Sequence, residues 1–240
     1  MYDGTNYSGW QVQPNGLSIQ QIVEEAVHTI LREDVSVVGS GRTDAGVHAL
    51  DQVAHFSSAQ ELDTEAFFRS LNGLLPFDIR LTKVYPVPLN FHAQKSAIQK
   101  EYHYYLCLNS FVPPFKRLYC LHVHHKLDLE LLDSACKLFL GTHDFTSFAN
   151  SAHEGAASKN AVRTIFRLDA VPWEYGIRLE FVGNGFLYKM VRNLVGMLLM
   201  VSSGKLSLGD IETILQAKDR RAAPMGAAAR GLFLAKVTYE

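Results

Sequence analysis

The sequence lacks the features that mark several classes of protein. Its cysteines are few, odd in number and without C-x-x-C spacing, which excludes a disulfide framework or a cysteine-based zinc site and indicates a reducing, cytoplasmic setting: Cys107, Cys120 and Cys136. Long apolar runs are also missing. The most apolar stretch, residues 186–201, is interrupted by charged side chains and falls short of the roughly 18 apolar residues that a membrane span needs. We therefore expect a buried helix there.

An excess of either charge is missing too. The 240 residues carry 23 Lys and Arg against 24 Asp and Glu, a formal net charge of -1, which argues mildly against a nucleic-acid binder but permits a local basic groove. Hydrophobic residues make up 48% of the chain, so it can bury the core of one large domain or two modest ones. No basic segment followed by an apolar run opens the chain, and we expect no secretory signal.

The spacing of apolar residues predicts mixed secondary structure. Helices are expected at residues 17–33, 63–74, 127–141, 186–201 and 208–217, the first with a capping box of Ser18 and Gln21. Strands are expected at 35–40, 52–58, 78–87, 100–108, 162–170, 177–183 and 231–240. Because the strands do not alternate regularly with helices, we expect an α+β fold of two similar subdomains, 1–97 and 98–240.

A glycine-rich segment, GSGRTDAGVHAL at residues 39–50, sets a base and an acid close together. Asp44 in such a loop can simply bond its own backbone in an Asx-turn. Alternatively, Arg42 keeps the carboxylate ionised, the glycines let another molecule approach the backbone, and His48 and His55 follow nearby. An ionised, partly desolvated carboxylate is an electrostatic stabiliser or a nucleophile, and the motif alone leaves both roles open.

Two further patterns could carry chemistry. HVHH puts His122 and His124 on one face of a strand, a spacing at which two imidazoles can share a metal, although no pattern such as HExxH lies nearby. In KEYHYYLCL the aromatic residues suit a core strand, but Tyr102 beside Lys100 can also offer a ring to a base and a charge to a phosphate.

Arg192 lies within the apolar stretch 186–201, where an unpaired charge is costly. Its partner must be an acid that the fold brings in, and Asp44 is the candidate. Alternatively, Arg192 lies on a solvated face or pairs with a structural acid.

Seven blocks of sequence occur in an order that closely resembles the TruA family of tRNA pseudouridine synthases. They are YDGTNYSGWQ, GRTDAGVHA with QVAHF, FHA, KEYHYY, DFTSF, NGFLYKMVRNLVG and GLFLAKVTY, and together they span nearly the whole chain. A single block could arise by chance, whereas seven in order indicate the family. The resemblance implies the pseudouridine synthase fold, with mixed, largely antiparallel sheets flanked by helices and a central cleft.

The resemblance also implies an activity. Members of the family are isomerases that convert uridine to pseudouridine at nucleotides 38, 39 and 40 in the anticodon stem-loop of tRNA. They detach the base at N1, turn it and reattach it through C5. No metal or organic cofactor takes part, and the enzymes work as homodimers with one tRNA spanning both subunits.

The matching blocks imply the site residues by position. Asp44 is the implied catalytic nucleophile, which adds to the base at C6 or attacks the ribose at C1′. Tyr102 would stack on the target base and could assist proton removal at C5. Arg192 would pair with Asp44, Arg42 would hold the displaced nucleotide, and Leu232 would make an apolar contact to the base.

Such a site must take a base out of an RNA stem and grip the RNA backbone. Basic side chains that could form the groove are Lys95, Lys100, Arg163, Arg167, Lys218, Arg220, Arg221 and Arg230.

The chain departs from the family pattern in two places. Met1 directly precedes Tyr2, where several apolar residues are usual, so the first strand is expected to be weak; Gln94 stands where a basic residue is common, with Lys95 as its substitute.

Two rival hypotheses belong to other classes. One is a non-catalytic RNA-binding module that keeps the pocket, and the presence of Asp44, Tyr102 and Arg192 together argues against it. The other is a metal-dependent hydrolase built on His122 and His124.

Overall fold

The chain forms two compact units. The computed structural model describes residues 1–150 and 160–240. The first unit comprises Met1–Ile98 and Phe233–Glu240, and the second comprises Gln99–Leu232. This division differs from the expected one in one respect, because most of the last strand, expected in the C-terminal subdomain, groups with the N-terminal residues.

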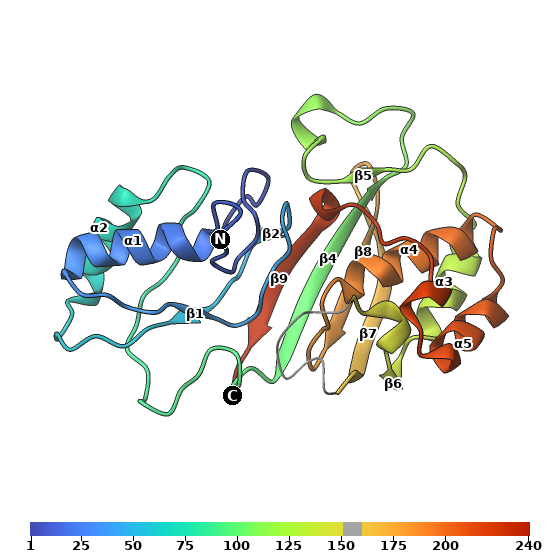
Figure 1. The fold of residues 1–240 in the computed structure, drawn as a ribbon. Coiled ribbons are helices and arrows are strands. Elements are labelled where there is room, and N and C mark those ends of the chain that lie inside the picture. The colour runs from blue at the N-terminus through green and yellow to red at the C-terminus, as the bar shows by residue number, and fades with distance from the viewer. Residues whose placement is uncertain (151–159) are drawn as a thin grey trace. The chain divides into compact units, whose positions relative to one another are not determined.

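Two amphipathic helices, α1 (Ile19–Leu31) and α2 (Thr64–Leu74), pack against each other in the first unit (Figure 1). Ser18 caps α1 as expected, since its hydroxyl accepts a hydrogen bond from the Gln21 amide at 3.2 Å. The reciprocal half of the capping box is not formed, because the Gln21 side chain donates instead to Glu25 one turn further on, at 2.9 Å. Only one of the two hydrogen bonds of a capping box is therefore present at the start of α1.

The strands of the first unit are very short. β1 (Val38–Gly39) pairs antiparallel with β3 (Ala54–His55). β2 (His48–Ala49) pairs parallel with the beginning of β9 (Leu232–Thr238). With so few ladder hydrogen bonds, the shape of this unit depends on contacts made by its loops.

The strand expected at 78–87 does not occur among the described residues. Tyr2 forms an isolated antiparallel bridge to Ile79, Met1 and Arg80 exchange backbone hydrogen bonds, and the ladder goes no further. The same segment lines a cavity of about 280 Å³ in the first unit, whose wall includes residues 79–85. Beyond these few hydrogen bonds the expected strand is therefore wrong.

A long antiparallel sheet forms the second unit. β4 (Gln99–Cys107) pairs with β8 (Gly176–Gly183), β8 with β7 (Val162–Trp173), and β7 with β6 (Gly141–Asp144). The short β5 (Leu121–His122) adds to the end of β4 in parallel. Alternate side chains of β4 are buried, which places Tyr102, Tyr104 and Leu106 on the core side.

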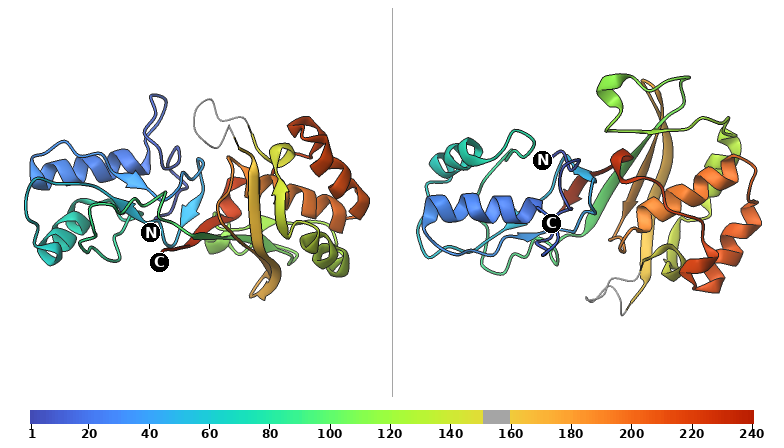
Figure 2. Two further views of the ribbon diagram at one scale, coloured as in Figure 1. Left: turned by 90° about the horizontal axis from the view of Figure 1, so that it is seen from below. Right: turned by 45° about the horizontal axis from the view of Figure 1, so that its top comes forward.

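Three helices cover one side of this sheet: α3 (Leu129–Lys137), α4 (Met190–Ser202) and α5 (Leu208–Ala217) (Figure 2). Most residues of α4 are buried, which confirms the buried helix expected in the apolar stretch. Helix α3 ends earlier than expected, and Gly141, with φ +91, begins β6 instead of stopping the helix. Strands flanked by helices in this mixed arrangement confirm the expected α+β class.

None of the helices in the described ranges has the length and apolar character needed to cross a membrane.

Candidate functional site

The loop that carries Asp44 lies between β1 and β2 and is held by the N-terminal block of the sequence. The amide of Val47 donates to the carbonyl of Asp44 at 3.1 Å and closes a turn. The amide of Trp10 donates to the carbonyl of Thr43, also at 3.1 Å. Gly9 has φ +95, and a Cβ there would lie 2.4 Å from that carbonyl oxygen. Only glycine fits so close an approach, so the two blocks form one structural element.

Buried hydroxyl groups hold the other side of the loop. The Tyr2 hydroxyl and Thr43 Oγ1 lie 2.7 Å apart, and both residues are buried. The Gln52 side chain donates to the carbonyl of Gly41 at 2.8 Å and accepts from the Ser40 hydroxyl at 2.7 Å. Burial raises the pKa of Tyr2 to about 12, so this phenol stays neutral. The loop is thus fixed in shape, and the Asp44 side chain it presents is half-buried.

The two histidines that follow the motif support the fold. His48 is 1% exposed, its ring stacks on Phe233 at 4.6 Å, and its Nδ1 lies 3.1 Å from the amide of Gly4. His55 accepts from the amide of Ala93 at 3.2 Å, and burial lowers its pKa. Both side chains therefore have structural roles in the first unit.

Arg42 is exposed and makes no ion pair within the part of the chain that the structure describes. The sequence motif alone suggested that Arg42 holds the carboxylate of Asp44, and this suggestion is wrong. The guanidinium points into solvent from the same loop, where a phosphate of a bound nucleotide could meet it.

Tyr102 lies on the core side of β4 in the second unit and is 8% exposed. Its ring meets that of Phe186 edge to face, with centroids 5.2 Å apart. Phe186 follows β8 in the block NGFLYK, and sequence reasoning did not single it out. One signal could have found Phe186: it comes shortly after Gly183, and Gly183 pairs with Lys100 near the start of β4. One apolar wall therefore joins two of the matched blocks.

Arg192 lies on α4 and is half-buried. Its Nε donates to the carbonyl of Ala227 at 2.8 Å, and the amide of Ala227 donates back to the Arg192 carbonyl at 2.9 Å. The next residue, Ala228, accepts the hydroxyl of Tyr104 at 2.7 Å. These hydrogen bonds link helix α4, strand β4 and the segment before β9. The alternative of a solvated surface position for Arg192 is therefore wrong.

Leu232 ends this tied segment and is buried, with 5% of its surface exposed. A Cβ on the preceding Gly231 would lie 2.9 Å from the ring of Tyr104, so the segment packs directly on β4. The predicted site residues therefore divide between the units. Asp44 and Arg42 belong to the first, whereas Tyr102, Arg192 and Leu232 belong to the second.

Four of the basic residues expected to grip RNA are engaged within the fold instead. They are Arg167, which pairs with Glu180 at 2.8 Å, Lys218 with Asp144 at 3.0 Å, Arg221 with Asp219 at 2.7 Å, and Arg220, which donates to Asn193 at 3.0 Å. Composition could not reveal this, because only the Asp219 partner of Arg221 is close in the sequence, whereas Glu180, Asp144 and Asn193 are brought in by the fold.

Lys100 and Arg163 form a different kind of pair. Burial lowers the pKa of Lys100, and the nearby charge of Arg163 lowers it further. Burial also lowers the pKa of Arg163, and a Cβ added at Gly185 would lie 3.7 Å from its Nε. An anion placed between these two half-buried cations would stabilise the charged form of both. Lys100 lies on β4 with Tyr102, and Arg163 lies near the start of β7.

The histidine pair that was weighed as a rival metal site is poorly suited to that role. His122 and His124 lie with ring centroids 4.0 Å apart, but His122 Nε2 lies 2.9 Å from the carbonyl of Asn109. Within the described ranges, the one group of three ligand-type side chains is Glu101, His103 and Glu180. Arg167 and Arg178 already neutralise those carboxylates, so that cluster suits an ion-pair network better than a metal.

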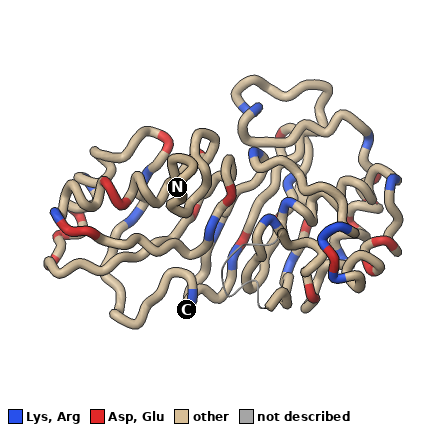
Figure 3. Tube along the Cα trace, in the orientation of Figure 1, with Lys and Arg blue, Asp and Glu red and all other residues tan. Residues whose placement is uncertain are grey.

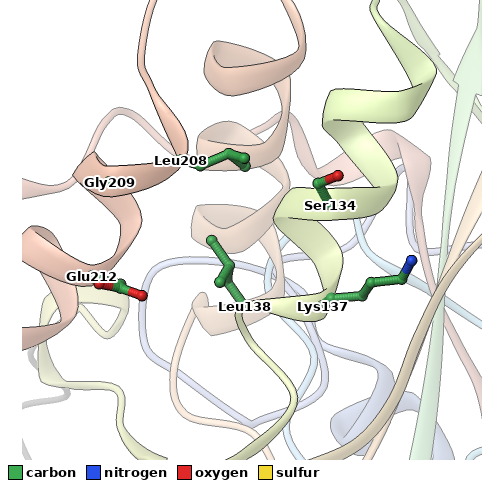
Figure 4. Close-up of a pocket in the computed structure, with 6 residues that line it drawn as sticks. All are labelled: Ser134, Lys137, Leu138, Leu208, Gly209 and Glu212. Carbon is green, nitrogen blue, oxygen red and sulfur yellow. The ribbon is translucent and has the colours of Figure 1, made fainter.

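A hollow of about 320 Å³ between α3 and α5 contains none of the predicted site residues (Figure 4). Its wall is formed by Ser134, Lys137, Leu138, Leu208, Gly209 and Glu212. Lys137 pairs with Asp133 at 2.6 Å on its own helix. The candidate chemistry therefore lies elsewhere.

Comparison with known proteins agrees with the motifs. A family profile described as tRNA pseudouridine synthase matches residues 1–94 and 135–240. The tRNA pseudouridine synthase A 1 of Protochlamydia amoebophila is 58% identical over 240 residues, covering 100% of this chain and 94% of the relative. The tRNA pseudouridine synthase A of Chlamydia muridarum is 46% identical, covering 99% and 89%. That of Limosilactobacillus reuteri is 44% identical, covering 99% and 94%. The chain belongs to the tRNA pseudouridine synthase family.

Proposed function

We propose that this protein isomerises uridine to pseudouridine at nucleotides 38, 39 and 40 in the anticodon stem-loop of tRNA, with Asp44 as the nucleophile. The observation that carries the proposal is the setting of Asp44. Its side chain is half-buried on a turn that Tyr2 and Trp10 of the YDGTNYSGW block hold through Thr43, and that Gln52 holds through the carbonyl of Gly41. A nucleophile must be positioned in this way and still be reachable.

The proposed reaction conserves all atoms. In one version the carboxylate of Asp44 attacks C1′ of the ribose and displaces N1, which leaves an ester; the base turns, and C5 bonds to C1′ while the ester bond breaks and frees the carboxylate. In the other version the carboxylate adds to C6 of the base, the N1–C1′ bond breaks, the base turns so that C5 bonds to C1′, and the bond from Asp44 to C6 then breaks. In both versions the proton on C5 is lost and N1 gains one. The product is an isomer, so neither an oxidant nor a co-substrate is consumed.

The other residues have binding roles in this proposal. Tyr102, backed by Phe186, stacks on the flipped base, and Leu232 makes an apolar contact with it. Arg192 is the proposed ion-pair partner of Asp44. Arg42 binds the displaced nucleotide, and the cations Lys100 and Arg163 bind RNA phosphate.

Release of tritium from tRNA labelled at C5 of uridine tests the proposal, because the C5 proton must leave. We expect release with the intact protein and none above background with Asp44→Asn. A matched control is Asp34→Asn, since Asp34 has a fully exposed side chain in the same unit. Equal release by Asp44→Asn and the control would contradict the role of Asp44. Binding of tRNA without any release by the intact protein would indicate a non-catalytic RNA-binding module.

Two parts of the proposal need tests of their own. We propose a homodimer with one tRNA spanning both subunits, which light scattering would detect as twice the 26.8 kDa of one chain. We also propose that the protein acts in the cytoplasm, which cell fractionation would test. A monomer that modifies tRNA at full rate would contradict the first part alone.

A further inference from the structure

An aromatic loop between β4 and β5 stands apart from the residues assigned so far. We call residues 109–120 the 109–120 loop; it is the light green segment that carries a short 3₁₀ turn in Figure 1. Phe111 is 65% exposed and Phe115 is 87% exposed. Leaving a phenylalanine ring in water is unfavourable relative to burying it, so two such rings on one loop call for an explanation.

The loop is built to a definite shape. The 3₁₀ turn Pro114–Lys116 follows Pro113, whose carbonyl accepts from the amide of Lys116 at 2.8 Å. The amide of Tyr119 donates to the carbonyl of Lys116 at 2.9 Å, and the Cys120 thiol donates to the same carbonyl at 3.3 Å. Little conformational entropy is therefore left to lose when a partner binds Phe115.

The loop and its flank are also basic. Residues 108–127 contain Lys116, Arg117 and Lys126 and no Asp or Glu, whereas the whole chain has a formal net charge of -1. Figure 3 shows this blue colouring on the loop. Neither Lys116 nor Arg117 forms an ion pair within the described ranges. Arg117 Nη1 donates to the carbonyl of Pro114 at 2.8 Å, which fixes its guanidinium beside the turn.

We propose that the 109–120 loop is a second RNA contact, in which Phe115 stacks on an unpaired base while Lys116 and Arg117 bind the flanking phosphates. Stacking on an exposed aromatic ring beside cations is the usual way to hold single-stranded RNA. A protein partner fits less well, because charged residues are depleted at the core of protein interfaces and these two cations follow Phe115 directly in the sequence. The inference rests on the proposed function in naming tRNA as the RNA.

Fluorescence of Phe115→Trp tests stacking directly. The natural tryptophans, Trp10 and Trp173, give a background that the unchanged protein measures. We expect short single-stranded oligouridylate to quench the added fluorescence, because a stacked base quenches indole, and duplex RNA of equal length to quench it far less. Equal or absent quenching by the two RNAs would overturn the proposed stacking.

Affinity for tRNA supplies the second readout, measured in the Asp44→Asn background so that it does not depend on turnover. We expect Phe115→Ala to raise Kd about tenfold and Phe115→Trp to leave it near the starting value. The matched control is Phe77→Ala, since Phe77 is 96% exposed beside the Arg80 guanidinium, 5.4 Å from the ring centroid. An unchanged Kd for Phe115→Ala would overturn the inference.

Salt dependence separates the cations from the ring. In the double variant Lys116→Ala with Arg117→Ala, the slope of log Kd against log salt should fall by about 1.4–1.8, because two phosphate contacts are lost. An unchanged slope would overturn the phosphate contacts. Loss of self-association with unchanged tRNA affinity would identify a protein interface instead. Absence of tritium release by the unchanged protein would refute the proposed function without affecting these binding results.

Discussion

The two units keep their shape by different means. In the second unit β4 pairs with β8 without interruption from Lys100 to Cys107, and a network of Glu180 with arginines links the strands. In the first unit β1, β2 and β3 are two residues long, and two glycine-containing blocks hold each other through close backbone contacts. The proposed nucleophile is therefore on the unit in which small changes of shape matter most.

The largest effect should come from Gly4→Ala, which disrupts these close backbone contacts directly. A Cβ at Gly4 would lie 1.9 Å from the carbonyl oxygen of Val47, so the Asp44 loop would have to move. We expect a loss of about 3 kcal/mol in the free energy of unfolding and a large loss of tritium release. Hydrogen exchange should rise in the first unit and stay low across β4 and β8. Uniform loosening of both units would contradict the comparison.

The converse test on the second unit is Glu180→Gln. Burial alone would raise the pKa of Glu180, but hydrogen bonds from Arg178 and Arg167 outweigh it and hold the pKa below its usual value. Stability from a lowered pKa is present above the unfolded pKa and is lost as pH falls through the folded one. We expect the variant to lose about 2 kcal/mol at pH 7, since both arginines are partly exposed.

Urea midpoints at pH 7 and at about pH 3 would measure this effect. The difference between Glu180→Gln and the unchanged protein should shrink at the lower pH, because Glu180 is then losing its charge. Glu212→Gln, an exposed residue of α5, is the control and should change little at either pH. A difference that grows on acidification would contradict the sign of the pKa shift.

Local patterns predicted the helices well. The helix expected at 208–217 is α5 with the same bounds, and Ser18 caps α1 as expected. Both depend on spacing and capping within one segment, which a sequence displays. The capping box failed in its second half because Gln21 had a competing partner, Glu25, on the next turn.

Non-local features were harder to predict. Arg167 was assigned to an RNA groove, because sequence cannot show that the register of β7 and β8 places Glu180 within 2.8 Å. The segment 78–87 has residues that favour a strand, but among the described residues its pairing goes no further than the contacts of residues 78–80 with residues 1–3. Phe186 was missed because its partner, Tyr102, is more than 80 residues away in the sequence. In each case the deciding contact is made by another part of the chain.

A smaller effect is expected from Tyr2→Phe, which removes one hydroxyl from beneath the Asp44 loop. Thr43 would lose its 2.7 Å partner in a buried place, at a cost of about 1 kcal/mol. We expect thermal unfolding at a slightly lower temperature and a modest fall in kcat with KM little changed, since only the position of the loop is altered. Tyr85→Phe, 60% exposed in the same unit, is the control. Equal loss in both variants would contradict a role for this hydroxyl in holding the loop.

The smallest effect, and one of opposite sign, is expected from Gly73→Ala. Gly73 lies near the end of α2, and a Cβ there would meet nothing within 4 Å. Alanine should stabilise the helix by about 0.5–1 kcal/mol, because glycine loses more conformational freedom on folding. A raised urea midpoint with unchanged tritium release would show that the same substitution stabilises the first unit in its helix and disrupts it at Gly4. Destabilisation by Gly73→Ala would instead mean that the glycines of this unit share a general sensitivity, and the special role of the two blocks around Asp44 would lose its support.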